Sequence, residues 1–300
     1  MDQEKKALKL SAGMALFMAA LGIVFGLLTQ SYAILLDGFF SLVGFAVAMV
    51  TIRVAWLVQQ PPDEHFHFGY AQFEPFLNTI KGLLMLGVSG FAVAGAVDSL
   101  LHGGRDLNAG LAVMYAVVAL SGCFVVAGIQ RRAASRTGSP LLEVDSKNWL
   151  IDGVLSGVVA LVFVAALILG GTDWSHVVPY IDPILVIVVV LAIIWVPVGI
   201  IRNGAKEILG FAPAAEVQSE VRGRVDGAIE GIPVKATNVS MMKIGRFFYI
   251  LNQIVVSPEF RPGRVEELDR VRERIAKAMD GFEPTPIIDT VFTEDEKWTE

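Results

Sequence analysis

The stretch SYAILLDGFFSLVGFA, residues 31–46, is an apolar run interrupted by one acidic residue, Asp37. A run of this composition is typical of a membrane-spanning helix, which needs about 20 predominantly apolar residues. A carboxylate near the centre of a bilayer costs about 2.5–3.5 kcal/mol on insertion scales, so it normally faces a bundle interior or a water-filled path. The stretch therefore predicts a spanning helix whose acid has a partner elsewhere in the chain.

The whole chain has the composition of a membrane protein. Of its 300 residues, 54% are hydrophobic and 18% are charged, whereas soluble domains carry about 25% charged residues. Six nearly uncharged runs are long enough to span a bilayer. They cover residues 9–29, 32–57, 73–101, 107–130, 141–170 and 178–203. Because five runs follow the first, we do not expect the first to be a cleaved signal peptide.

The charges between the runs predict the orientation of the chain. The basic residues of one side are Lys5, Lys6, Lys9, Arg131, Arg132, Arg136, Arg202 and Lys206. The loops of the opposite side carry only Arg105. Since basic loops remain in the cytoplasm, we expect both termini to be cytoplasmic and the protein to lie in the inner (cytoplasmic) membrane of a bacterium.

A second domain is predicted after Lys206, where the composition becomes polar. Residues 214–230 and 263–282 have helical patterns, while residues 234–245, 246–258 and 285–295 are strand-like. The predicted fold is therefore an all-α bundle of six membrane helices in residues 1–206, followed by a small cytoplasmic α+β domain with the order αββαβ in residues 207–300. A domain of about 90 residues has only a modest hydrophobic core, so dimerisation would stabilise the domain.

Polar residues on the second and fifth runs share helix faces. Asp145, Asn148 and Asp152 are spaced three and four apart, and so lie on one face, while Asp37 and Ser41 are four apart. If the two helices pack side by side, Asp37 faces Asp152 and Ser41 faces Asn148. Four oxygen ligands with two carboxylates suit Mg²⁺, Mn²⁺ or Ca²⁺ and tolerate Fe²⁺.

The alternative is that these acids only form hydrogen bonds within the bundle, or pair with Lys81 of the third run. Lys81 itself has two interpretations. It neutralises Asp145 as a structural ion pair, or it stands in for a cation during a transport cycle. The sequence leaves both open.

Three motifs resemble those of the cation diffusion facilitator family. SYAILLDGFFSL is similar to its pattern S-x-A-x-L-x-D-x-x-x-S-L, and PPDEHFHFGYAQFEP is similar to P-D-x-x-H-x-F-G-x-G-x-x-E. LLEVDSKNWLIDG is similar to L-x-A-D-x-x-H-x-x-x-D. The resemblance implies a homodimer that exports a divalent metal, usually by proton antiport, with a cytoplasmic metallochaperone-like αββαβ domain.

The chain departs from the family at the metal ligands. The usual pair on the second span corresponds to Phe40 and Gly44, and the usual histidine on the fifth corresponds to Asn148, whereas Asp152 is retained. The expected site is therefore displaced about one turn outward. It consists of Asp37, Ser41, Asn148 and Asp152, with Asp145 toward the cytoplasm. This site leaves the cation open among Mn²⁺, Fe²⁺, Co²⁺, Mg²⁺ and Zn²⁺.

The loop between the second and third runs contains Asp63, His65 and His67. Family members often have a secondary metal site here, and these three residues are its candidates. The histidines that the motif expects correspond to Phe66 and Tyr70, so the alternative is a solvated loop with incidental histidines.

The function predicted from these observations is export of a cation in exchange for protons by a homodimer in the lipid bilayer. One alternative is a non-transporting scaffold or partner subunit of the same fold, and another is an exchanger of a different cation such as Na⁺. We expect no enzyme activity, because hydrolase, metalloprotease and phosphate-loop motifs are missing from the sequence. No cofactor and no nucleic-acid partner are expected.

Overall fold

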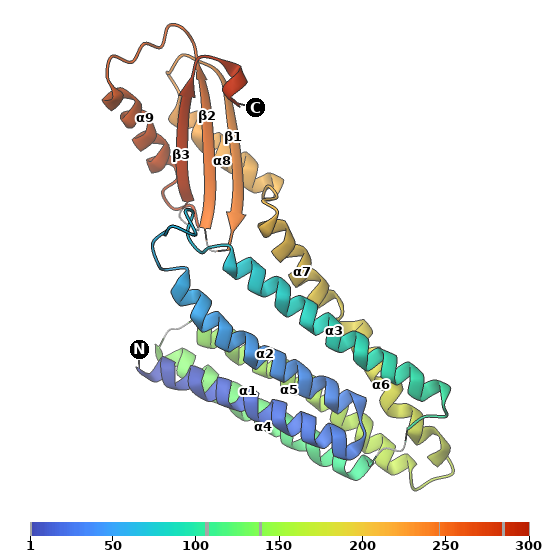
Figure 1. The fold of residues 1–300 in the computed structure, drawn as a ribbon. Helices are drawn as coiled ribbons and strands as arrows, with labels where there is room; N and C mark the ends of the chain where they lie inside the picture. Colours follow the sequence, from blue (N-terminus) through green and yellow to red (C-terminus); the bar gives the residue numbers. More distant parts are fainter. Residues whose placement is uncertain (1, 106–107, 138–139, 246, 284–285, 300) are drawn as a thin grey trace. The chain divides into compact units, whose positions relative to one another are not determined.

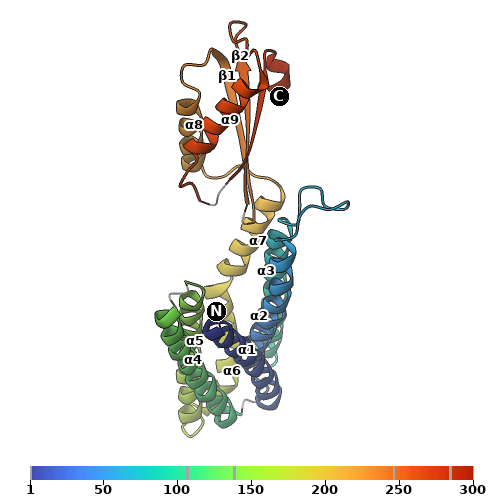
Figure 2. The same ribbon diagram turned by 90° about the vertical axis from the view of Figure 1, so that its left-hand side faces the viewer.

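The computed structural model describes residues 2–299, apart from 106–107, 138–139, 246 and 284–285. Contacts divide the chain into two units, Met1–Ile52 with Ile80–Ile201, and Arg53–Thr79 with Arg202–Glu300. Six helices in the described part are long and apolar enough to cross a membrane, which confirms the six predicted spans. Figure 1 and Figure 2 show the ribbon from two sides.

Long helices make up the first unit and connect it to the second. They are α1 (Asp2–Thr29), α2 (Tyr32–Leu57), α3 (Phe73–Leu101), α4 (Ala109–Thr137), α5 (Pro140–Leu169), α6 (Val178–Ile193) and α7 (Trp195–Ile208). A buried cluster that includes Met18, Cys123 and Phe163 joins α1, α4 and α5. The indole Nε1 of Trp149 on α5 donates to the Ser11 hydroxyl on α1 at 2.7 Å. Packing and a buried polar bond therefore hold these three helices together.

Helices α2, α3 and α6 share a separate buried cluster, which includes Leu36, Ala96 and Val186. Helix α2 also crosses α1 at a pair of glycines. A Cβ atom built on Gly22 would lie 2.5 Å from the Gly38 Cα atom, and one built on Gly38 would lie 2.6 Å from the Ile23 nitrogen. Only residues without a side chain permit this approach of two helix backbones.

The sixth apolar run, predicted as one segment over residues 178–203, forms two helices. Helix α6 ends at Ile193 and α7 begins at Trp195. Pro197 has no N–H group, so it cannot donate to the carbonyl four residues earlier, and its ring crowds that carbonyl. The proline at position 197 therefore explains why the helix is interrupted at Ile194.

The second unit contains a mixed three-stranded sheet and two helices. Its elements are α8 (Ala215–Ala228), β1 (Val234–Ile244), β2 (Phe247–Val256), α9 (Val265–Ala278) and β3 (Pro286–Thr293). The strand order is β1-β2-β3, with β1 and β2 antiparallel and β2 and β3 parallel. This confirms the predicted order of helices and strands. Gly245, at the turn after β1, has a φ of +57°, which glycine adopts without a steric penalty.

Helices α8 and α9 pack on one face of the sheet. Val221 and Val225 of α8, Ile250 and Ile254 of β2 and Ile275 of α9 are fully buried in one cluster. This core follows from alternation along β2, where every second side chain points to the helices.

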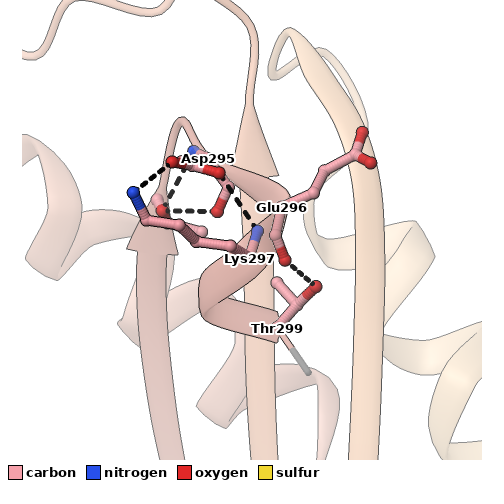
Figure 3. A network of polar contacts seen from close by, with 5 residues as sticks. Asp295, Glu296, Lys297 and Thr299 are labelled. Atoms are coloured by element: carbon pink, nitrogen blue, oxygen red, sulfur yellow. Dashed lines mark hydrogen bonds and ion pairs between the residues drawn. The ribbon is translucent and has the colours of Figure 1, made fainter.

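The opposite face of the sheet contacts the segment after β3. Gln253 donates to the Trp298 carbonyl and Asn238 donates to the Thr299 carbonyl, both at 2.9 Å. Figure 3 shows the turn that precedes these contacts, where the Lys297 ammonium lies 2.7 Å from the Asp295 carboxylate. The segment is therefore held by hydrogen bonds to β1 and β2 and by an ion pair within the segment.

Candidate cation site

Asp37 is the sixth residue of α2 and accepts a hydrogen bond from the hydroxyl of Tyr115 on α4. Tyr115 is only 2% exposed, and its ring centroid lies 5.9 Å from that of Phe25 on α1. Packing therefore fixes the tyrosine, and the tyrosine in turn orients the carboxylate. Sequence reasoning missed Tyr115, because a single tyrosine in an apolar run usually serves as an amphipathic packing residue.

Of the two predicted ligand acids on α5, Asp152 is the one that interacts with Asp37. Asp152 is within electrostatic range of both Asp37 and Asp145. Asp145 forms a side-chain hydrogen bond with Ser11 of α1, but its Oδ2 atom is buried and lacks a hydrogen-bond partner among the described residues. Asp152 therefore interacts with a carboxylate on α2 and with another on its own helix, while the placement of Asp37 directly opposite Asp152 stays a prediction.

The rest of the predicted ligand set is less closely assembled. Ser41 is half-buried and Asn148 is exposed, and neither side chain forms a hydrogen bond within the described part of the chain. Across those same residues, no group of three or more His, Cys, Asp and Glu side chains is arranged to hold a metal. The set of Asp37, Ser41, Asp145, Asn148 and Asp152 therefore stays a prediction.

Exposure supports an ion-related role for two of these acids. Both Asp37 and Asp152 are exposed residues in the chain, although each lies inside a span. Carboxylates inside a span usually face a water-filled cavity or a polar partner rather than lipid. Cys123, which is 5% exposed and is the only cysteine of the chain, is within electrostatic range of both.

Both carboxylate oxygens of the loop acid Asp63 accept hydrogen bonds from other residues of the loop. Its Oδ1 atom accepts the backbone N–H groups of His65 and Phe66 at 2.9 Å, and its Oδ2 atom accepts the hydroxyl of Tyr70. These bonds, with that of Tyr70 the strongest, lower the pKa of Asp63 below its ordinary value. A metal held by Asp63, His65 and His67 would compete with these bonds for the carboxylate oxygens, and this secondary site stays a prediction.

Two further charged residues complete the description of the spans. Lys81 is half-buried and forms no ion pair with any residue that the structure describes, so neither of its predicted roles is tested. Asp182 of α6 is 1% exposed and hydrogen-bonded to the start of α2. Sequence reasoning missed Asp182, although its position inside the sixth run was the signal applied to the other acids.

Six apolar helices, carboxylates inside the spans and a small α/β domain define a class of integral membrane protein. The sequence model of the cation efflux transmembrane domain matches residues 8–209. The chain therefore belongs to the cation efflux, or cation diffusion facilitator, family, whose members are transporters and not enzymes.

Three relatives illustrate the match. The uncharacterized transporter sll1263 of Synechocystis is 30% identical over 70% of this chain and 66% of its own length. The magnetosome protein MamM of Magnetospirillum gryphiswaldense is 24% identical over 85% of this chain and 77% of its own. The cation-efflux pump FieF of Shewanella oneidensis is 30% identical over 47% of this chain and 46% of its own. The chain thus spans slightly less than two thirds of the first relative.

Proposed function

We propose that the protein exports a divalent metal cation from the cytoplasm in exchange for protons. The observation that carries this proposal is the approach of two exposed intramembrane carboxylates, Asp37 of α2 and Asp152 of α5, to within electrostatic range. A cation neutralises such a pair, and so do protons, which means that the two compete for the same oxygens. Competition of this kind couples the movement of one to the movement of the other.

The residues have distinct roles in this proposal. Asp37 and Asp152 bind the cation and accept the exchanged protons, while Ser41 and Asn148 contribute neutral oxygen ligands. Asp145, with its unpartnered buried oxygen, lies on the access route from the cytoplasm. The cation-binding oxygens are hard ligands, which favour Mn²⁺, Mg²⁺ or Fe²⁺ over Zn²⁺. The cytoplasmic membrane of a bacterium, with both termini inside, is the proposed location.

Flux measurements in vesicles test the proposal. Purified protein is reconstituted, a pH gradient is imposed, and uptake of Mn²⁺, Fe²⁺, Co²⁺, Zn²⁺ and Mg²⁺ is measured separately. We expect at least one cation to move uphill, and we expect Asp37→Ala and Asp152→Ala each to abolish that movement. Asp98→Asn is the matched control, since the side chain of Asp98 is 74% exposed at the end of α3. Unchanged flux in both alanine variants would show that the site assignment is wrong.

A non-transporting scaffold is the second candidate. The lack of a three-ligand metal cluster among the described residues favours it, as does the replacement of two usual ligands by Phe40 and Gly44. Thermal unfolding with and without Mn²⁺ distinguishes the two functions. Stabilisation by the cation that disappears in Asp152→Asn supports transport, whereas no stabilisation by any of the five cations supports the scaffold.

We also propose that the protein works as a homodimer through residues 207–300, because the small core of that region gains stability from a second copy. Mass measurement of the detergent-solubilised protein tests this. We expect a mass of two chains plus detergent. A single chain at micromolar concentration would contradict the proposal.

A further inference from the structure

The first turn of α2 is bound by an acid from α6. The carboxylate of Asp182 accepts the Ser31 hydroxyl at 2.5 Å, the Tyr32 backbone N–H at 2.8 Å and the Ala33 backbone N–H at 3.3 Å. Asp182 is 1% exposed and Ser31 is fully buried. The contact is therefore a water-excluded link between residues 150 positions apart in the sequence.

This link satisfies the start of the helix. The first turn of any helix leaves backbone N–H groups without partners inside the helix. Asp182 accepts the first two, and the Ser31 hydroxyl oxygen accepts the third, from Ile34, at 3.1 Å. The negative charge also lies at the positive end of the helix dipole. A serine alone caps many helices, so the additional carboxylate from another helix does more than cap.

Neighbouring contacts fix α6 at the same place. The Arg105 backbone N–H donates to the Pro179 carbonyl at 2.9 Å. The guanidinium of Arg105 lies 4.3 Å from the centre of the Tyr32 ring and within electrostatic range of Asp182. Arg105, the start of α6 and the start of α2 thus contact one another, next to the buried cluster shared by α2, α3 and α6.

Asp37 lies five residues beyond Tyr32, which is about 7.5 Å along the helix axis. A helix transmits a shift of its first turn over this distance without deforming. We propose that Asp182 is a positioning residue: it fixes the outer end of α2 to α6 and thereby sets where the Asp37 carboxylate lies relative to Asp152. The effect of Asp182 on transport rests on the proposed function. The claim that Asp182 fixes the position of α2 relative to α6 does not depend on transport.

Two readouts test the inference in the full-length protein. The first is Mn²⁺ transport in vesicles, where KM and maximal rate are measured for Asp182→Asn, Asp182→Glu and the exposed control Asp98→Asn. The second is the rate at which N-ethylmaleimide modifies Cys123. This native thiol shares a buried cluster with Ile34 of α2 and interacts electrostatically with Asp37, so it reports on the position of α2 without any transport.

We expect Asp182→Asn to raise KM several-fold and to increase the modification rate of Cys123 several-fold, with Asp98→Asn unchanged in both. Asp182→Glu, which retains the charge, should recover part of each effect. A merely structural role would lower the maximal rate through loss of folded protein and leave KM and the thiol rate of the folded fraction unchanged. That outcome would overturn the inference.

The two proposals fail in different ways. If the wild-type protein moves no Mn²⁺, the proposed transport of that cation is wrong, and the thiol rates still decide whether Asp182 positions α2. If transport occurs but both Asp182 variants match the wild type in KM and in thiol rate, only the positioning role is wrong. Should Asp182→Asn fail to fold, Asp182→Glu and Ser31→Ala give the same comparison, with a smaller expected change for each.

Discussion

At the scale of single residues, the hydroxyl of Tyr115 is the partner that the intramembrane acid Asp37 uses. A cation that binds through the same Oδ2 atom of Asp37 has to replace this bond. A hydrogen bond to a charged group contributes about 1.5 kcal/mol or more, so Tyr115→Phe should tighten cation binding by about tenfold. Titration calorimetry with Mn²⁺ on the detergent-solubilised protein measures the change.

Tyr180→Phe is the control for this prediction, because Tyr180 is a half-buried tyrosine at the start of α6. It removes the same hydroxyl without affecting Asp37. Weaker binding in Tyr115→Phe would contradict the competition and would indicate instead that the phenol oxygen is itself a ligand of the cation.

A second residue-level prediction concerns the loop acid Asp63. Its hydrogen bonds lower its pKa below the ordinary value of 3.8. The loop is therefore stabilised at every pH above 3.8, and this stabilisation is lost as the pH falls through the lowered pKa. We expect the side-chain carboxyl carbon signal of Asp63 in NMR spectra to keep its shift from neutral pH down to that range.

Asp63→Asn should change the amide signals of His65 and Phe66 already at neutral pH, since the charged acceptor of both N–H groups is gone. Glu64→Gln removes a charge from an adjacent exposed position and should leave them unchanged. A transition of the Asp63 carboxyl signal well above pH 4 would show that the carboxylate is not held as the structure describes.

At the scale of elements, the crossing of α1 and α2 depends on two glycines. Gly38→Ala places a methyl group 2.6 Å from the backbone of α1, and overpacking of this kind costs about 1–3 kcal/mol. Gly44→Ala on the same helix meets nothing within 4 Å and should be neutral or stabilising by up to about 1 kcal/mol. Thermal unfolding in detergent should show a lower midpoint for Gly38→Ala only; equal midpoints would contradict the close crossing.

The helices were predictable from the sequence because bilayer thickness imposes one length on every span. The interruption at Ile194 was not predicted, although Pro197 is its evident cause, since a proline inside an apolar run is tolerated in many membrane helices. The αββαβ order was predictable because turn residues such as Gly231 and Gly281 separate its periodic segments. Helical spacing identified the faces of α2 and α5, but spacing within one helix does not reveal its neighbours, and so Tyr115 on α4 was missed.

At the scale of the whole molecule, the two units have separate hydrophobic cores. Ile250→Ala removes a fully buried side chain from the core of the second unit, at a cost of about 2–5 kcal/mol. We expect differential scanning calorimetry to show one transition that moves to lower temperature and one that does not. A single transition that shifts as a whole would mean that the units unfold together.

The sheet of the second unit also has a consequence for how the chain folds. Strands β1 and β2 are joined by a short turn, so they can pair as soon as both have been synthesised. Strand β3 pairs in parallel with β2 only after α9 has crossed over the sheet, and such non-local pairing is slow. During translation, one edge of β2 therefore stays open to pairing with other chains until residue 293 has left the ribosome, which makes this edge the place where aggregation of a nascent chain would begin.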